Sequence, residues 1–136
     1  MASRARATVV ALSLCTALIA GCGSSSSKPG YCSSLSNLEA SIKALPSTDI
    51  VKNGTSALES ALKKVQSDAN AVVSGAKSDF PNETSALKSS IDALSTTVKQ
   101  LTSSPSAATL AQVPGQVTAV ANAVKGFTSA ASSKCG

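Results

Sequence analysis

Four segments of this chain repeat apolar side chains at steps of three and four residues, and breaks that contain proline separate them. The breaks read ALPSTD at 44–49, SDFPNE at 78–83 and SSPSA at 103–107. The repeating positions, one of them polar, are Tyr31, Leu35, Leu38, Ile42 and Leu45; Val51, Thr55, Leu58, Leu62, Val65, Ala69, Val72, Ala76 and Phe80; Leu87, Ile91, Leu94, Val98 and Leu101; and Leu110, Val113, Val117, Val120, Val124, Phe127 and Ala131. A mean step of about 3.5 residues puts each set on one face of an α-helix, as in the buried seam of a helical bundle. The sequence therefore predicts an all-α fold.

The predicted helices span about 32–45, 49–79, 83–102 and 106–134. Their short connections, roughly three to six residues each, favour antiparallel neighbours and hence an up-down-up-down four-helix bundle. Two dipeptides weaken the helical pattern locally. Asn53-Gly54 can split off the first turn of the second helix, and Pro114-Gly115 should kink the fourth. The apolar spacing continues through both, so we expect one bent fourth helix.

The composition agrees with helices and limits what their core contains. Hydrophobic residues make up 43% of the 136 residues, but aromatic residues only 2%. Leu, Val, Ile and Ala must therefore fill the core. Ala-rich composition with little Gly or Pro favours helix over sheet, and this length allows one domain.

The N-terminal segment has the organisation of a signal peptide. MASRAR is short and basic, and an apolar stretch of about fourteen residues follows it, whereas about twenty are needed to cross a bilayer. The stretch ends in IAGC, with Gly21 directly before Cys22. These residues resemble the lipobox of bacterial lipoproteins.

The lipobox resemblance implies that residues 1–21 are a lipoprotein signal peptide, cut off between Gly21 and Cys22. It also implies that the Cys22 thiol carries a diacylglyceryl group with acyl chains such as palmitate, which anchors the protein to the extracytoplasmic face of the bacterial cell membrane. The alternative is an ordinary cleaved signal peptide, with Cys22 as a structural cysteine. Residues 22–30 are a tether rich in Ser and Gly, and the eight residues after Cys22 reach at most about 28 Å.

The number of cysteines fits a lipid on Cys22, because acylation leaves an even number for pairing. Cys15 is removed with the signal peptide, so Cys32 and Cys135 remain. In a bundle of four antiparallel helices, the C-terminus returns to the end at which the first helix starts. We therefore expect a disulfide between Cys32 and Cys135 in an oxidising compartment, with two free thiols as the alternative.

Several classes of chemistry lack the residues that they require. The chain has no His, and its single Met is the initiator, so the axial ligands of haem bundles and the Glu-x-x-His pairs of di-iron bundles are absent. Nucleophilic triads usually need a His base, and zinc needs a Cys or His cluster. Arg4 and Arg6, the two arginines, lie in the signal peptide. We therefore expect no enzyme, no catalytic residues, no metal or other cofactor, and no nucleic-acid partner.

The region from residue 31 onward resembles small, uncharacterised secreted helical proteins of actinobacteria. The stretch DIVKNGTSALESALKKVQSDANAV and the terminal cysteine pair carry this resemblance. It implies no activity.

Two functions fit these features. The first is a membrane-anchored module for interaction or envelope structure, whose partners are the membrane, through the lipid on Cys22, and an unknown protein. Its distal loops, Pro46–Asp49 and Thr102–Ala107, are the expected contact points, whereas Phe80 and Tyr31 pack at the end nearer the membrane. The alternative is a carrier that holds an apolar small molecule or lipid within the bundle core, where small Ala and Val side chains leave room.

Overall fold

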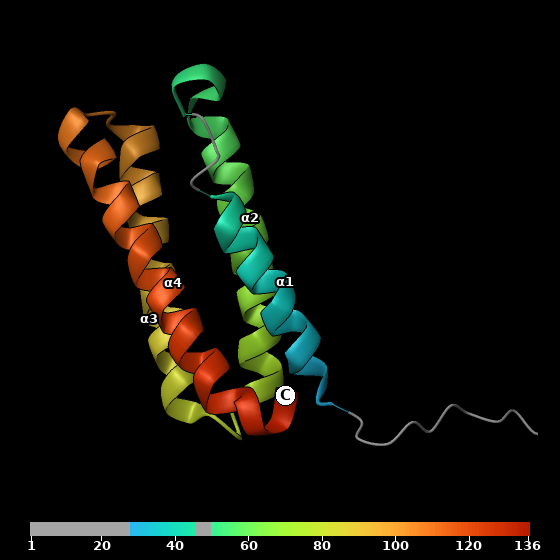
Figure 1. Ribbon diagram of the computed structural model, residues 1–136. Coiled ribbons are helices and arrows are strands. Elements are labelled where there is room, and N and C mark those ends of the chain that lie inside the picture. Colours follow the sequence, from blue (N-terminus) through green and yellow to red (C-terminus); the bar gives the residue numbers. More distant parts are fainter. Residues whose placement is uncertain (1–27, 46–49) are drawn as a thin grey trace, which may run out of the picture.

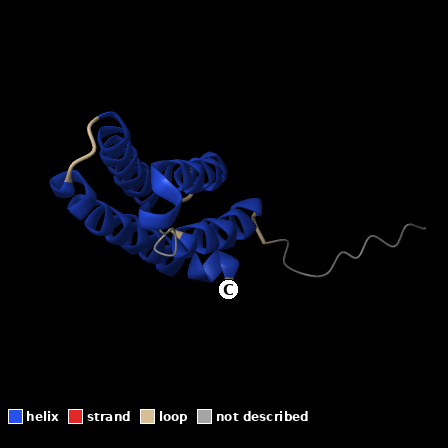
Figure 2. Ribbon diagram, turned by 90° about the horizontal axis from the view of Figure 1, so that it is seen from above, coloured by secondary structure: helices blue, strands red, loops and turns tan. Residues whose placement is uncertain are grey.

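Four α-helices make up most of the described chain, residues 28–45 and 50–136 of the computed structural model (Figure 1). They are α1 (Gly30–Ala44), α2 (Ile50–Ala76), α3 (Pro81–Ser103) and α4 (Ala107–Cys135). Figure 2 shows helices joined by loops, and the described residues include no strand. The predicted all-α fold is confirmed.

The order of the helices along the chain is also their order around the bundle. α1 contacts α2 and α4, and α3 contacts the same two helices. Packing is most extensive within the α1–α2 and α3–α4 hairpins. The start of α1 and the C-terminus lie at one end of the bundle, and the α3–α4 connection lies at the opposite end (Figure 1). This arrangement is the predicted up-down-up-down four-helix bundle.

The core consists of the apolar positions that the sequence repeats. Every member of the first and third predicted sets is buried, as are most members of the other two. The departures are Leu110, which is 39% exposed, and Thr55, Phe80 and Val117, which are half-buried. The side chain of Val51 lies outside the described part of the chain. Helical spacing thus identified the core faces of all four helices.

The exposure of Leu110 and Val117 follows from the unequal lengths of α1 and α4. α1 has 15 residues and α4 has 29, which correspond to about 22 Å and 43 Å of helix. Because the two helices are antiparallel and meet at the termini, α1 can cover only the C-terminal half of α4. Leu110 and Val117 lie in the N-terminal half.

Gly54 interrupts the regular helix near the start of α2. Its φ of 69° and ψ of −175° lie in a region that side-chain-bearing residues rarely adopt. A Cβ atom at this position would meet no neighbouring atom within 4 Å, so the backbone conformation, not lack of space, explains the glycine. Of the two possibilities that Asn53-Gly54 left open, the structure has the one in which a first turn is separate from the rest of α2.

Pro114 lies inside α4 without ending it. Its missing N–H leaves the carbonyl of Leu110 without its intrahelical partner. Both residues are exposed, so water can supply that hydrogen bond. The helix continues through this position, as its apolar spacing indicated.

The helix boundaries differ from the predicted ones by one to three residues. The largest difference is at the end of α2, where the backbone N–H groups of Asp79 and Phe80 both donate to the Ala76 carbonyl, at 3.0 and 2.8 Å. This tight turn ends the helix at Ala76. Pro81 then occupies the first turn of α3, where its missing N–H has no intrahelical partner to lose.

Parts of the predicted organisation lie outside the described residues. These are the signal peptide at 1–21, most of the tether at 22–30, and the distal loop Pro46–Asp49. The end of the tether is described, and its last residue, Gly30, already belongs to α1.

Candidate functional site

A disulfide between Cys32 and Cys135 joins the start of α1 to the end of α4. Their Cα atoms are 5.5 Å apart, which is usual for a disulfide, and 103 positions separate them in the sequence. The bundle topology brings the two cysteines together, because α1 and α4 are antiparallel neighbours. The predicted pairing is confirmed.

The three aromatic side chains of the chain meet at this disulfide end. Tyr31 comes from α1, Phe80 from the α2–α3 connection and Phe127 from α4. Their rings make edge contacts, with centroids 5.4 Å apart for Phe80–Phe127, 6.0 Å for Tyr31–Phe80 and 6.5 Å for Tyr31–Phe127. Such pairs contribute about 0.5–1.5 kcal/mol each beyond the area that they bury. Phe80 and Tyr31 therefore close this end of the bundle, as expected from their places in the sequence.

Asp79 links α1 to α4 through two hydrogen bonds. The Tyr31 hydroxyl and the Lys134 ammonium group both donate to Asp79 Oδ2, each at 3.1 Å. The hydrogen bonds from Lys134 and Tyr31 hold the pKa of Asp79 below its usual value. The same contact with Asp79 raises the pKa of Lys134, and burial together with the bond to Asp79 raises the pKa of Tyr31.

The sequence analysis did not identify Asp79 and Lys134 as interacting residues. Their places in the sequence do indicate that they lie near each other, because Lys134 directly precedes Cys135 and Asp79 directly precedes Phe80. Once the disulfide and the position of Phe80 are predicted, both residues fall at the same end of the bundle. Their contact still depends on side-chain directions that helical spacing does not give.

We expect the Asp79→Asn variant to have a lower free energy of unfolding than the wild type at neutral pH. The difference between the two proteins should become smaller at both low and high pH. The pKa of Asp79 is lower in the folded state than in the unfolded state. Its contribution to the free energy of unfolding is therefore present above about pH 4 and is lost as the pH falls through the folded-state pKa. Lys134 and Tyr31 have raised pKa values, so their contribution is present below about pH 10 and is lost as the pH rises through those folded values. Urea unfolding from pH 2 to 12 measures the profile.

The matched control for this experiment is Asp92→Asn, which removes an exposed ion pair within α3, Lys88–Asp92 at 2.8 Å. Such pairs contribute little, so the control should differ less from the wild type at neutral pH. A difference between wild type and Asp79→Asn that stays constant across the pH range would contradict the predicted linkage.

The predicted lipidation and cleavage positions, Cys22 and Gly21, lie outside the described residues. The tether is described only from Lys28, where it enters α1 beside the disulfide. Lys28, Pro29, Gly30, Cys32, Ser33 and Cys135 line a shallow cleft of about 360 Å³ at this place. The tether therefore joins the bundle at the disulfide end.

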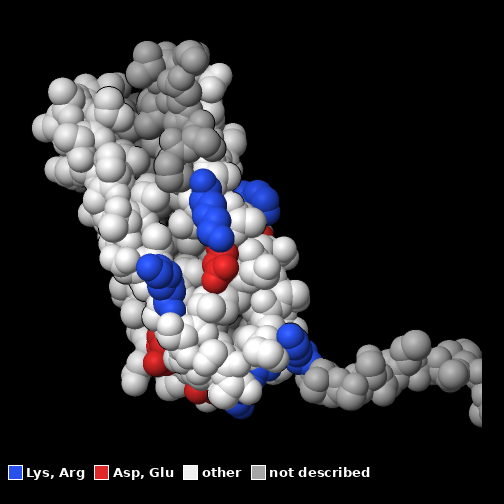
Figure 3. Space-filling view, in the orientation of Figure 1, with Lys and Arg blue, Asp and Glu red and all other residues white. Residues whose placement is uncertain are grey.

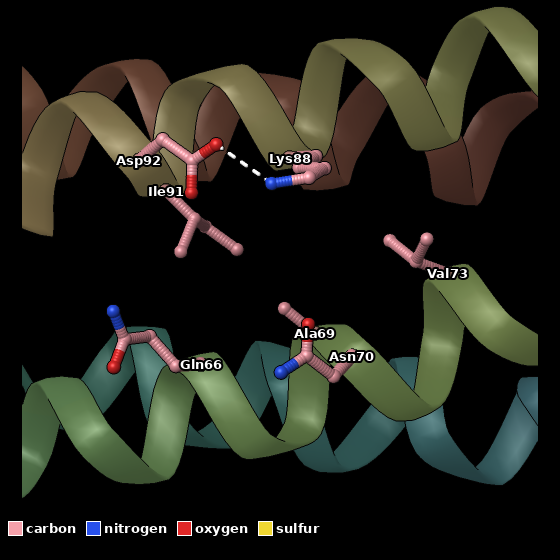
Figure 4. Close-up of a pocket in the computed structure, with 7 residues that line it drawn as sticks. All are labelled: Gln66, Ala69, Asn70, Val73, Lys88, Ile91 and Asp92. Carbon is pink, nitrogen blue, oxygen red and sulfur yellow. Dashed lines mark hydrogen bonds and ion pairs between the residues drawn. The ribbon is translucent and has the colours of Figure 1, made fainter.

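A second groove, of about 330 Å³, lies between α2 and α3 (Figure 4). Ala69, Val73 and Ile91 supply its apolar surface, and the Lys88–Asp92 ion pair lies on its α3 side. On the α2 side, the amide of Gln66 donates to the Ser95 hydroxyl at 3.0 Å. Most of the polar groups around this groove are thus already paired within the protein.

A third groove, of about 390 Å³, lies between α1 and α2 and includes Ser41 and Lys64. Both residues bond to Asp68: the Ser41 hydroxyl donates to Asp68 Oδ2, and Lys64 forms an ion pair with it at 3.0 Å. Burial raises the pKa of Asp68, but the hydrogen bonds from Ser41 and Lys64 outweigh it and lower the pKa overall. The charges at this groove are therefore also neutralised within the protein.

The described residues contain no group of three or more Cys, His, Asp or Glu side chains that could hold a metal ion. None of the described helices combines the length and the hydropathy of a membrane span. No protein-family model, curated protein or solved structure matches this chain.

Proposed function

We propose that this protein is a membrane-anchored extracytoplasmic lipoprotein whose helical bundle acts as an interaction or envelope-structural module. One observation supports it most: the tether, α1 and α4 meet at the disulfide end of the bundle. Cys22 lies eight residues before Gly30, the first residue of α1. A lipid on Cys22 would therefore hold the disulfide end within about 28 Å of the membrane and direct the opposite end outward.

The charge distribution agrees with a functional difference between the two ends. No charged residue occurs between Lys99 and Lys125, a stretch that includes the α3–α4 connection and the first half of α4. On the face shown in Figure 3, the Lys and acidic side chains lie between the middle of the bundle and the disulfide end, and the described atoms at the other end are uncharged. The uncharged stretch between Lys99 and Lys125, which carries the exposed Leu110, suits contact with another protein, because charged residues are depleted at the centres of interfaces.

We favour this function over a carrier that holds its ligand inside the core. Phe127 and eight Leu and Val side chains of the described core are less than 2% exposed; the eight are Leu38, Leu58, Leu87, Leu94, Val65, Val72, Val98 and Val120. The grooves described above lie between helices at the surface. A ligand within the core would have to displace side chains that already pack there.

The Cys22→Ala variant tests the anchor. The wild-type chain should remain in the membrane fraction and incorporate an alkyne analogue of palmitate, whereas Cys22→Ala should incorporate none and should keep its signal peptide. Cys15→Ala is the matched control and should behave as the wild type does. Labelling of Cys22→Ala at the wild-type level would exclude this lipidation site.

Site-specific crosslinking tests the interaction module separately. A photoreactive amino acid at Ser104, in the exposed α3–α4 connection, should form an adduct of defined mass with a protein partner in intact cells. The same amino acid at Ser89, on the exposed side of α3, is the control and should form less of this adduct. Equal yields from both positions, or no adduct from either, would argue against the α3–α4 end as a contact surface.

A further inference from the structure

The groove between α1 and α4 differs from the other grooves in its charges. Its volume is about 290 Å³, and it is lined by Glu39, Ile42 and Lys43 from α1 and Ala121, Val124 and Lys125 from α4. Ile42 and Val124 are buried, and Ala121 is half-buried, so these three side chains form an apolar floor. The charged side chains belong to exposed or half-buried residues around that floor.

Lys43 and Lys125 have no ion-pair partner within the described chain. Lys64 and Lys88, which line the other two side grooves, are each paired with an aspartate one turn away. Glu39 accepts a hydrogen bond from the Thr128 hydroxyl at 2.7 Å, which ties its carboxylate to α4. The α1–α4 groove therefore combines an apolar floor with two lysine ammonium groups that are free to bind an anion.

The small side chain of Ala121 makes room for an apolar group between the helices. Beyond it along α4, Val117 is half-buried and Leu110 is exposed, in the half of the helix that α1 does not reach. Steps of seven, four and three residues lead from Leu110 through Val117 and Ala121 to Val124 and place these side chains on one face of α4, as an extended hydrocarbon chain would require. Binding sites of this kind have mostly apolar walls with a few placed polar groups.

We propose that the α1–α4 groove binds a fatty carboxylate, with the carboxylate between Lys43 and Lys125 and the hydrocarbon chain on Ile42, Ala121 and Val124. Two lysines and one glutamate leave a local charge of about +1, which suits the single negative charge of a carboxylate. This site is distinct from the lipid proposed on Cys22, and it does not depend on that lipid. It lies on the side of the bundle, between two helices, and not inside the core.

Photoaffinity labelling of the full chain in its membranes tests this proposal. The probe is octanoate with a diazirine at the end of its chain, and mass spectrometry locates the labelled residues. We expect labelling on α1 and α4 at the groove, competition by unmodified octanoate, and little labelling by the same chain with a trimethylammonium head. Equal labelling by the anionic and cationic probes would overturn the proposal, as would labelling dispersed over all four helices.

Two kinds of variant separate the head group from the chain. The double variant Lys43→Glu/Lys125→Glu should reduce groove labelling by up to about 25-fold, because two exposed ion pairs are lost and each contributes up to about a fivefold effect. Lys88→Glu/Lys99→Glu is the charge-matched control. Ala121→Leu should fill the groove and block labelling without a change in charge, whereas Ala119→Leu, at an exposed position on the same helix, should not. Unchanged labelling of both groove variants would refute the site, and unfolding curves like those of the wild type establish that the variants are folded.

Discussion

Replacing both Cys32 and Cys135 with serine is expected to lower the free energy of unfolding by about 4–5 kcal/mol. The disulfide closes a loop of 103 residues, and in the chain-entropy model a loop of about 100 residues loses this much stability when it is opened. The stability of a whole domain is about 5–15 kcal/mol. For a bundle of this size the loss corresponds to a fall in Tm of roughly 15–25 °C, measured by circular dichroism.

Two controls identify the disulfide as the cause of that loss. Reduction of the wild-type protein should lower its Tm to the value of the double serine variant, and reduction of the variant itself should have no further effect. Cys15→Ser, which alters a cysteine predicted to leave with the signal peptide, should unfold as the wild type does. A double variant with the Tm of the oxidised wild type would show that packing alone holds the ends of α1 and α4 together.

The pairing of Cys32 with Cys135 was predictable from the sequence because it depends on few assumptions. Cys32 and Cys135 could be paired from the cysteine count and the parity of four antiparallel helices, with no knowledge of side-chain directions. The lipobox entered that argument by assigning Cys22 to a lipid. The pairing is observed, whereas the lipid on Cys22 stays a prediction.

The buried positions of the core were also predictable from the sequence, because helical spacing alone indicates them. A period of about 3.5 residues fixes which face of each helix is buried, and in α1 and α3 every repeated position is buried. Leu110 departs from the pattern because burial also needs a neighbouring helix. α1 ends at Ala44, and the length of one helix is not visible in the periodicity of another.

The groove between α1 and α4 could not be predicted from the sequence. Its lining combines residues about 80 positions apart, such as Lys43 and Lys125, whose relation depends on the rotation and register of two helices. The Asp79–Lys134 ion pair has the same origin, since 55 positions separate its members. Pairs of this kind need the relative placement of the helices to about an ångström, and a pattern of buried faces does not contain that information.

Phe127→Ala is expected to destabilise the bundle by about 3–5 kcal/mol, the range for removing a buried Phe side chain. Phe127 is fully buried and makes edge contacts with both Tyr31 and Phe80. The substitution removes those contacts and leaves a cavity at the disulfide end of the bundle, where the bond between α1 and α4 limits how far the helices can move to close the space. Urea unfolding with the disulfide intact measures the effect.

Phe80→Ala is the matched variant, because it removes the same side chain from the same cluster at a half-buried position. Its loss of stability should be clearly smaller, since part of the ring is already in contact with water and less of a cavity forms. Phe127→Leu, which keeps most of the side-chain volume, should also be less harmful than Phe127→Ala. Equal losses for Phe127→Ala and Phe80→Ala would mean that the ring contacts, and not the buried volume of Phe127, determine the stability of the disulfide end.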